Sequence, residues 1–145
     1  MIKRYGEPVR VGRKYKYRPG AYAILTRGDD VLLTFQADPF YEFQLPGGGI
    51  DPHENPIPAL HREVMEETGW RISIRRHIET YRRFVFMPEY GIWAEKVCHI
   101  YHGHPTLRIS DPTEAGHTDL WAPASSAVAM LKNPADAEML QRYLG

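Results

Sequence analysis

Cysteine is almost absent from this 145-residue chain, which has only Cys98, and no run of about twenty apolar residues occurs in it. A single cysteine cannot close an internal disulfide, so the sequence excludes a small secreted scaffold built on disulfides and fits the reducing cytosol. Residues 1–20 are basic but lack the apolar stretch of a signal peptide. We therefore expect a cytoplasmic protein without a membrane partner.

The chain also lacks an excess of either charge, because eighteen basic residues balance eighteen acidic ones. Such a balance gives no global attraction to nucleic acid or to an anionic membrane, so local groups must hold any phosphate-bearing partner. Residues 1–18 stand apart, since they contain seven of the basic residues. We interpret them as a basic N-terminal arm or edge segment, with a phosphate or nucleic-acid contact as the alternative.

What is present is the composition of a globular domain, with 43% hydrophobic and 25% charged residues. A chain of this length buries roughly two-thirds of its unfolded surface and is one domain by the usual length prior. We predict a single domain over residues 1–145.

The local patterns predict an α/β fold. The expected strands cover residues 21–27, 31–35, 43–45, 70–87, 92–103 and 117–123, and the turn at 28–30 joins the first two as a hairpin. One helix is expected between Pro56 and Gly69, because proline is tolerated near a helix start and glycine just past its end. Residues 125–144 are helical in two pieces, with a break at Asn133-Pro134. This order predicts a mixed β-sheet with helices on both faces.

The stretch "HREVMEETGW" sets three carboxylates on one arc of the central helix. At about 100° per residue, Glu66 and Glu67 fall within roughly 60° on either side of Glu63. Like charges at these spacings are unfavourable by roughly a few tenths of a kcal/mol per pair, and the last turn of a helix is the wrong end for anions. A cation is expected to compensate them, unless this is a solvated face on which Arg62 pairs with Glu66.

The residues ahead of this helix, "LPGGGIDPHE", favour a ligand site. Glycines form a loop that lets backbone approach a ligand closely and leaves amide and carbonyl groups uncovered. Clustered hard oxygen ligands suit Mg²⁺ or Mn²⁺, which commonly bridge carboxylates to substrate phosphates. The residues alone therefore predict a divalent-metal site for phosphates.

The spacing of these residues resembles the complete signature of the Nudix family, the Nudix box. It begins with Gly48, continues after five residues with Glu54, and after seven more with "REVMEETGW", Arg62 to Trp70. Nine fixed positions at fixed spacing are far more specific than an isolated glycine-rich loop. The one departure is Trp70, which is aromatic where the family usually has an aliphatic residue. The resemblance implies a Nudix-like α/β/α sandwich with a mixed β-sheet between helices.

The Nudix resemblance also implies an enzyme that hydrolyses a nucleoside diphosphate linked to another group, by attack of water on phosphorus, with Mg²⁺ or Mn²⁺ as cofactor. By resemblance, the metal ligands are Gly47 through its carbonyl, Glu63, Glu66 and Glu67. The catalytic residues are Glu63, Glu67, Arg62 and Glu114, and the substrate-binding residues include Gly48 and Gly49. Arg62 and Glu54 match the pair that orients the helix carboxylates.

Glu114 is included because the family often adds a carboxylate from a loop outside the box, as metal ligand or general base. It stands in "SDPTEAGHTDLWAP", just before the last expected strand, and a solvated loop glutamate is the alternative. Glu95 is a weaker competitor, since a lone strand carboxylate usually belongs to a polar face. The sequence leaves open whether Glu63 or Glu114 accepts the proton from water.

Two further features are candidates for binding a ligand. Arg82 and Arg83 follow each other on a strand, so only one can face a pocket. We assign phosphate binding to Arg82, against the commoner case of an exposed strand arginine. His102-Gly103-His104 has the composition of a metal site but lacks a third ligand, which disfavours zinc.

The substrate is the least determined part of the prediction. We favour a small-molecule nucleotide, such as a nucleoside triphosphate or a dinucleotide, because the balanced charge argues mildly against capped or triphosphorylated RNA. An RNA 5′-pyrophosphohydrolase is one alternative. A non-hydrolytic nucleotide-binding Nudix-fold module is another, disfavoured because such modules usually lose box glutamates and all four are present here. A homodimer is also left open.

Overall fold

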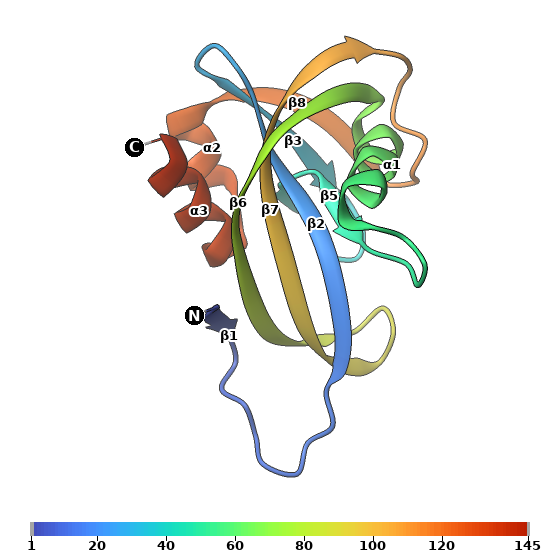
Figure 1. Cartoon of the computed structure of the whole chain (residues 1–145), viewed down its shortest axis with the longest axis vertical. Helices are drawn as coiled ribbons and strands as arrows, with labels where there is room; N and C mark the ends of the chain where they lie inside the picture. Colours follow the sequence, from blue (N-terminus) through green and yellow to red (C-terminus); the bar gives the residue numbers. More distant parts are fainter. Residues whose placement is uncertain (1, 145) are drawn as a thin grey trace.

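The computed structural model describes residues 2–144 as a mixed β-sheet flanked by three helices (Figure 1). The strands are β1 (Lys3–Gly6), β2 (Lys16–Arg27), β3 (Asp30–Gln36), β4 (Glu42–Gln44), β5 (Gly47–Gly49), β6 (Trp70–Met87), β7 (Ile92–Arg108) and β8 (His117–Pro123). The helices are α1 (Pro56–Thr68), α2 (Ala124–Met130) and α3 (Pro134–Leu144). The predicted α/β fold with a mixed sheet between helices is confirmed.

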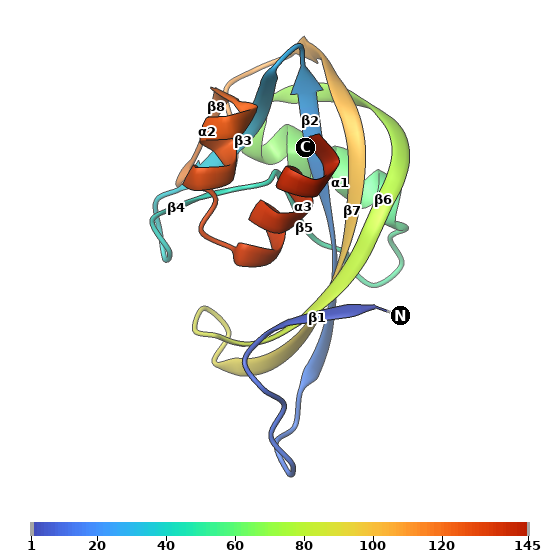
Figure 2. The same cartoon turned by 90° about the vertical axis from the view of Figure 1, so that its left-hand side faces the viewer.

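The sheet has the strand order β1-β6-β7-β2-β3-β4, and β5 pairs with β2 while β8 pairs with β3. β1 is parallel to β6 and β2 is parallel to β7, whereas β6 and β7 form a long antiparallel ribbon. Three register shifts bend this ribbon. Figures 1 and 2 show that its turn and the first residues of β2 lie below the three helices in these views.

All six expected strands are present, and the differences in their bounds follow from pairing. The hairpin between β2 and β3 has its turn at Gly28 and Asp29, as predicted. β2 begins at Lys16 and not at residue 21, because Lys16 to Leu25 pairs continuously with β7. β4 lies one residue earlier than predicted. The three glycines expected as a loop form β5, since they pair with residues 20–22 of β2.

The basic residues 1–18 lie at the edge of the sheet and in the connection that follows. Lys3–Gly6 forms β1 and pairs with Tyr81 to Phe84 of β6. The ammonium group of Lys3 lies 2.8 Å from the carboxylate of Glu138 in α3. Residues 7–15 connect the edge strand to β2, which takes the last three residues of the basic segment.

Two apolar clusters hold the helices against opposite faces of the sheet. Leu60 and Val64 of α1 are buried in one cluster together with Leu25 of β2. Met139 of α3 is buried in the other, together with Ile24 of β2. Adjacent strand residues point to opposite faces, so β2 contributes to both clusters. None of the helices in the described residues is long and apolar enough to cross a membrane.

Candidate active site

α1 directs its acidic residues toward β5 because its other side is apolar and packs on the sheet. Pro56 is the first residue of the helix. The backbone N–H at this position has no partner within a helix, so its absence in proline removes no hydrogen bond. Gly69 ends it in the left-handed conformation at φ 75°, and its N–H donates to the carbonyl of Met65 at 2.9 Å. A Cβ at Gly69 would lie 1.8 Å from the carbonyl oxygen of Ser110. Glycine therefore both ends the helix and lets the segment after β7 dock there.

This docked segment brings a loop carboxylate to the helix. The backbone N–H groups of Thr113 and Glu114 donate to the carbonyl oxygen of Glu66 at 2.8 and 2.9 Å, and that of Ile109 donates to Gly69 at 2.8 Å. Carbonyl groups at the end of a helix have no partner within it, so the loop satisfies them. The same bonds fix Glu114 beside Glu66.

Three carboxylates meet at this point. One oxygen from each of Glu63, Glu66 and Glu114 lies within 4.8 Å of the other two. The structure thus places the predicted loop residue Glu114 with the helix carboxylates. Glu95 is elsewhere, with its carboxylate 3.5 Å from the guanidinium of Arg82. Clustered carboxylate oxygens are the donors that Mg²⁺ and Mn²⁺ prefer, so these side chains fit the divalent metal that the family implies.

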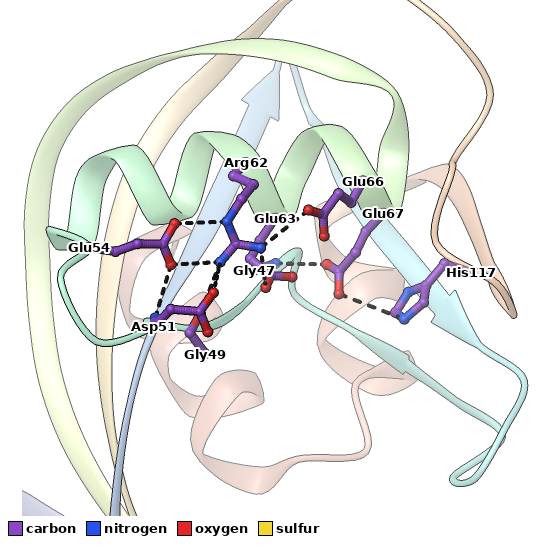
Figure 3. Close-up of polar contacts among 9 residues, drawn as sticks. All are labelled: Gly47, Gly49, Asp51, Glu54, Arg62, Glu63, Glu66, Glu67 and His117. Atoms are coloured by element: carbon purple, nitrogen blue, oxygen red, sulfur yellow. Dashed lines mark hydrogen bonds and ion pairs between the residues drawn. The ribbon is translucent and has the colours of Figure 1, made fainter.

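Arg62 compensates the negative charge on this side of α1 (Figure 3). Its guanidinium donates two hydrogen bonds of 2.8 Å to Glu54, and Nη1 donates to Glu63 at 3.1 Å and to Glu66 at 3.2 Å. The forked bond to Glu54 fixes the orientation of the guanidinium as well as its place. Hydrogen bonds from Arg62 also lower the pKa of Glu54 to about 2. Arg62 therefore links Glu54 to the carboxylate cluster, as the family resemblance implied.

The carboxyl groups of Glu63 and Glu67 are harder to ionise than ordinary glutamates in the metal-free protein. Burial raises the pKa of Glu63 to about 7; the charge of Arg62 opposes this rise, and the charges of Glu66 and Glu114 add to it. Burial likewise raises the pKa of Glu67 well above its ordinary value. A nearby cation favours the ionised form of a carboxyl group. The electrostatics of the site therefore suit a bound metal ion.

Glu67 lies beside the cluster, with its oxygens turned toward Gly47 and His117 (Figure 3). Oε1 accepts a hydrogen bond of 2.9 Å from the N–H of Gly47, and Oε2 lies 3.7 Å from Nε2 of His117. Nδ1 of His117 is 2.9 Å from the hydroxyl of Thr34. Sequence reasoning missed His117. Its one signal is its position three residues after Glu114, at the first residue of β8.

The glycine strand β5 leaves room for the carboxylates. A Cβ at Gly48 would lie 2.6 Å from the carboxyl carbon of Glu63. Contacts this short do not occur between real side chains, so any larger residue would displace the carboxyl group. The lack of a side chain at position 48 thus creates the space in which Glu63 can face a ligand.

A pocket of about 440 Å³ adjoins the cluster. Its lining includes Glu63, Glu67, Glu114 and the three glycines of β5. It continues along one face of β6 through Tyr81, Arg83 and Val85. Asn133 and Asp136, at the start of α3, also line it. The pocket therefore extends from the carboxylates along the sheet.

The lining of this pocket does not include Arg82, to which the sequence analysis assigned phosphate binding. The guanidinium of Arg82 pairs with Glu95 at 3.5 Å. Arg83 lines the pocket instead. Successive strand residues alternate between faces, and the buried pocket residue Tyr81 fixes which face is which.

His102 and His104 both contact Thr26. Nε2 of His102 is 2.9 Å from the hydroxyl of Thr26, and Nδ1 of His104 is 3.0 Å from the carbonyl oxygen of Thr26. Within residues 2–144, no group of three or more potential metal ligands includes either histidine.

The fold is an α/β sandwich, and its carboxylate cluster suits a divalent metal bound to phosphates. Residues 16–143 match the family model described as the NUDIX domain, so the chain belongs to the Nudix family. The predicted family is confirmed, and the chain is accordingly a hydrolase that acts on phosphoanhydride bonds.

The names of the relatives describe hydrolases that act on different substrates. The chain is 31% identical over 121 residues to a proposed 8-oxo-dGTP diphosphatase of Bacillus subtilis (strain 168). The matched region covers 81% of this chain and 74% of that protein. It is 28% identical over 122 residues to the CMP-5′-(N-acetyl-N-hydroxy-3-aminopropyl)phosphonate hydrolase of Streptomyces rubellomurinus (strain ATCC 31215), covering 79% and 56% of the two chains. Over 59 residues it is 42% identical to the RNA pyrophosphohydrolase of Helicobacter pylori (strain G27), covering 37% and 38%.

Solved structures share the fold at low sequence identity. A Nudix hydrolase from Nitrosomonas europaea superposes with a TM-score of 0.74 at 20% identity, covering 89% of each chain. The MutT protein from Methanosarcina mazei Go1 gives a TM-score of 0.72 at 18% identity, covering 90% of this chain and 94% of that one. These similarities confirm the Nudix α/β/α sandwich.

Proposed function

We propose that this Nudix hydrolase cleaves a small nucleotide, a nucleoside triphosphate or a dinucleotide, in a reaction that depends on Mg²⁺ or Mn²⁺. The observation that carries the proposal is the meeting of Glu63, Glu66 and Glu114 within 4.8 Å beside a pocket of about 440 Å³. Pockets of this size accommodate small molecules. A free, buried Cys98 is consistent with the cytosolic location that we assign to the enzyme.

The roles follow from the contacts. Glu63, Glu66 and Glu114, with Glu67 and the carbonyl of Gly47, would hold the metal. When bound, the metal supplies neutralisation of phosphate charge and a water molecule of lowered pKa.

The protein itself positions these groups and takes the proton. Arg62 orients Glu63 and Glu66 through its hydrogen bonds. The exposed backbone of Gly48 and Gly49 binds the substrate phosphates. Glu63 or Glu114 accepts the proton of the attacking water, since both lie in the cluster.

The first experiment identifies the substrate. Nucleoside triphosphates, dinucleoside polyphosphates, ADP-ribose and 5′-triphosphorylated RNA are assayed for released phosphates with Mg²⁺ and with Mn²⁺. Turnover of a nucleoside triphosphate or dinucleotide, abolished by excess chelator, supports the proposal. Preference for the RNA substrate would favour the alternative that the Helicobacter relative's name suggests.

The second experiment tests the cluster. Glu63→Gln keeps the shape of the side chain but removes a charge and should lower kcat by roughly a hundredfold or more. Glu114→Gln should show a similar loss if the loop carboxylate takes part in the reaction. Glu7→Gln, a change at an exposed glutamate outside the pocket, is the matched control. A folded Glu63→Gln variant with the wild-type rate and metal dependence would refute the assignment.

A further inference from the structure

His117 faces the oxygen of Glu67 that Gly47 does not hold. Only 4% of the His117 side chain and 7% of the Glu67 side chain are exposed. Oε1 of Glu67 accepts the N–H of Gly47 at 2.9 Å, whereas Oε2 lies 3.7 Å from Nε2 of His117 (Figure 3). Within residues 2–144, no other basic side chain comes within 4.0 Å of this carboxylate.

Thr34 determines which nitrogen of the His117 ring carries the hydrogen. Its hydroxyl lies 2.9 Å from Nδ1, is completely buried in β3, and has no other hydrogen-bond partner in the described part of the chain. If this hydroxyl accepted a hydrogen from Nδ1, its own hydrogen would lack an acceptor and the lone pair of Nε2 would face a carboxylate. The hydroxyl therefore donates to Nδ1, and Nε2 carries the hydrogen.

The position of the ring is fixed by β3 and by the loop that brings Glu114 to the cluster. His117 is the first residue of β8 and the register partner of Gln36 in β3. Its backbone N–H donates to the carbonyl oxygen of Glu114 at 3.3 Å. Thr34, two residues from Gln36, lies on the same face of β3. These contacts hold Nε2 toward Glu67.

The carboxylate of Glu67 thus has a donor on each side. A buried carboxylate is costly unless donors compensate its charge. The N–H of Gly47 reaches one oxygen, and Nε2–H of His117 points to the other across 3.7 Å. That separation is longer than a hydrogen bond, so the contact in the metal-free protein is electrostatic. Donors on both sides restrict rotation of the carboxylate about its last bond.

We propose that His117 is a positioning residue, which acts through Glu67 and holds its carboxylate in the orientation that binds the metal. This inference rests on the proposed function, because it takes Glu67 as a metal ligand. Removing a group that orients a metal ligand typically lowers metal affinity or activity by roughly 10-fold to 100-fold. His117 therefore contributes to metal affinity without being a ligand itself.

The test uses two substitutions that separate the two ring nitrogens. The amide nitrogen of asparagine takes the place of Nδ1, and that of glutamine takes the place of Nε2. His117→Asn thus removes the donor to Glu67, whereas His117→Gln keeps it. Binding of Mn²⁺ without nucleotide is measured from the electron paramagnetic resonance signal of the free ion. It should weaken roughly tenfold or more in His117→Asn and stay within about threefold of the wild type in His117→Gln.

His102→Asn is the matched control. Nε2 of His102 also lies 2.9 Å from a threonine hydroxyl, that of Thr26, but on β7 beside Tyr143 of α3. The control removes this contact and should keep the wild-type affinity for Mn²⁺, even where its melting temperature falls. A purely structural His117 would behave in the same way, so wild-type affinity in a folded His117→Asn variant overturns the proposal. An equal loss of affinity in His117→Asn and His117→Gln also overturns it.

A double-mutant cycle tests whether His117 acts through Glu67. In a Glu67→Gln background, His117→Asn should weaken Mn²⁺ binding by no more than about twofold, because two residues that act through one contact are not additive. A further tenfold loss there would overturn the proposal. Should His117→Asn not fold, as judged by circular dichroism, His117→Ser takes its place with the same expectations.

Turnover separates this inference from the proposed function. If the wild type cleaves nucleotides with Mn²⁺ while His117→Asn binds the ion normally, the positioning role alone is overturned. If His117→Asn weakens Mn²⁺ binding and His117→Gln does not, but the wild type cleaves no nucleotide, the proposed substrate class alone is overturned.

Discussion

Glu63 and Gly48 face each other where α1 meets β5. The carboxyl carbon of Glu63 would lie 2.6 Å from a Cβ at position 48, and the obstructed atoms belong to the end of a flexible side chain. We expect Gly48→Ala to fold with nearly wild-type stability but to displace the carboxyl group. Misplacing a catalytic group by about 1 Å lowers rates by roughly a hundredfold. The measurements are kcat and the melting temperature of the same preparation.

Gly49→Ala is the control for the fold, because a Cβ at Gly49 meets no protein atom within 4 Å. It should leave the melting temperature close to the wild type and, since only backbone groups of Gly49 are assigned to the substrate, it should lower kcat much less than Gly48→Ala. Equal activity in the two alanine variants would mean that the position of the Glu63 carboxyl group does not limit the reaction.

Glu67 combines a structural contact with an unfavourable charge. Its carboxylate is buried near Glu63 and accepts the N–H of Gly47 at 2.9 Å. Glu67→Gln keeps the acceptor and removes the charge, so metal-free stability should stay unchanged or rise by roughly a few tenths of a kcal/mol, while kcat falls. Urea unfolding in excess chelator measures the first effect.

A comparison with Glu67→Ala isolates the hydrogen bond. The alanine variant leaves the N–H of Gly47 without its partner and should be less stable by about 1–3 kcal/mol. If the glutamine variant were destabilised as much as the alanine variant, the charge itself would be the stabilising partner.

α1 shows which parts of the site were predictable from the sequence. The spacing of Glu63, Glu66 and Glu67 and the bounding Gly69 are properties of one continuous helix, and the structure reproduces them. The pair of Arg62 with Glu54 is also nearly local, since both belong to the same motif. The local sequence pattern is therefore sufficient to predict this half of the site.

The other half depends on pairing between distant strands. Whether Arg82 or Arg83 faces the pocket is decided by the register of β6 against its neighbours, which the sequence pattern does not encode. His117 meets Glu67 because β8 pairs with β3, beside Thr34. The glycines form β5 because β2 accepts them as a partner. Long-range register is thus the information that sequence reasoning lacked.

Asp136 in the first turn of α3 connects that helix to β6. It accepts the hydroxyl of Tyr81 at 2.8 Å, and burial raises its pKa to about 6. The unfolded chain has an ordinary pKa near 4, so between about pH 4 and pH 6 the folded state binds more protons than the unfolded state. The contribution of Asp136 to the free energy of unfolding therefore falls as pH rises through that window, by about 3 kcal/mol in total.

Asp136→Asn removes this dependence while keeping an acceptor for Tyr81. Its stability relative to the wild type should increase between pH 4 and pH 7, as measured by urea unfolding at several pH values. Ser125→Ala, a change at an exposed side chain that does not titrate, should show no such trend and serves as the control. A constant difference between Asp136→Asn and the wild type would contradict the raised pKa.

The molecule separates its stable core from its chemistry. The two apolar clusters lie on opposite faces of the sheet between the helices, whereas the carboxylates gather where α1, β5 and the loop before β8 meet. Repulsion among Glu63, Glu66 and Glu114 acts on that junction alone, where it opposes the docking of the loop. Binding of a cation there should consequently stabilise the whole fold, because unfolding would separate its ligands.

The last prediction concerns this linkage between metal and stability. A ligand that binds only the folded state stabilises it by about 2.7 kcal/mol at a hundredfold excess over its dissociation constant. For a chain of 145 residues this corresponds to a rise in melting temperature of about 8 °C with Mg²⁺ or Mn²⁺, reversed by chelator. Glu63→Gln and Glu114→Gln should melt at or above the wild-type temperature without metal and lose most of the increase with metal, because each removes both a repulsive charge and a ligand. Glu7→Gln should retain the full increase. If the metal raises the melting temperature of Glu63→Gln as much as that of the wild type, the cation binds elsewhere and the carboxylate cluster is not its site.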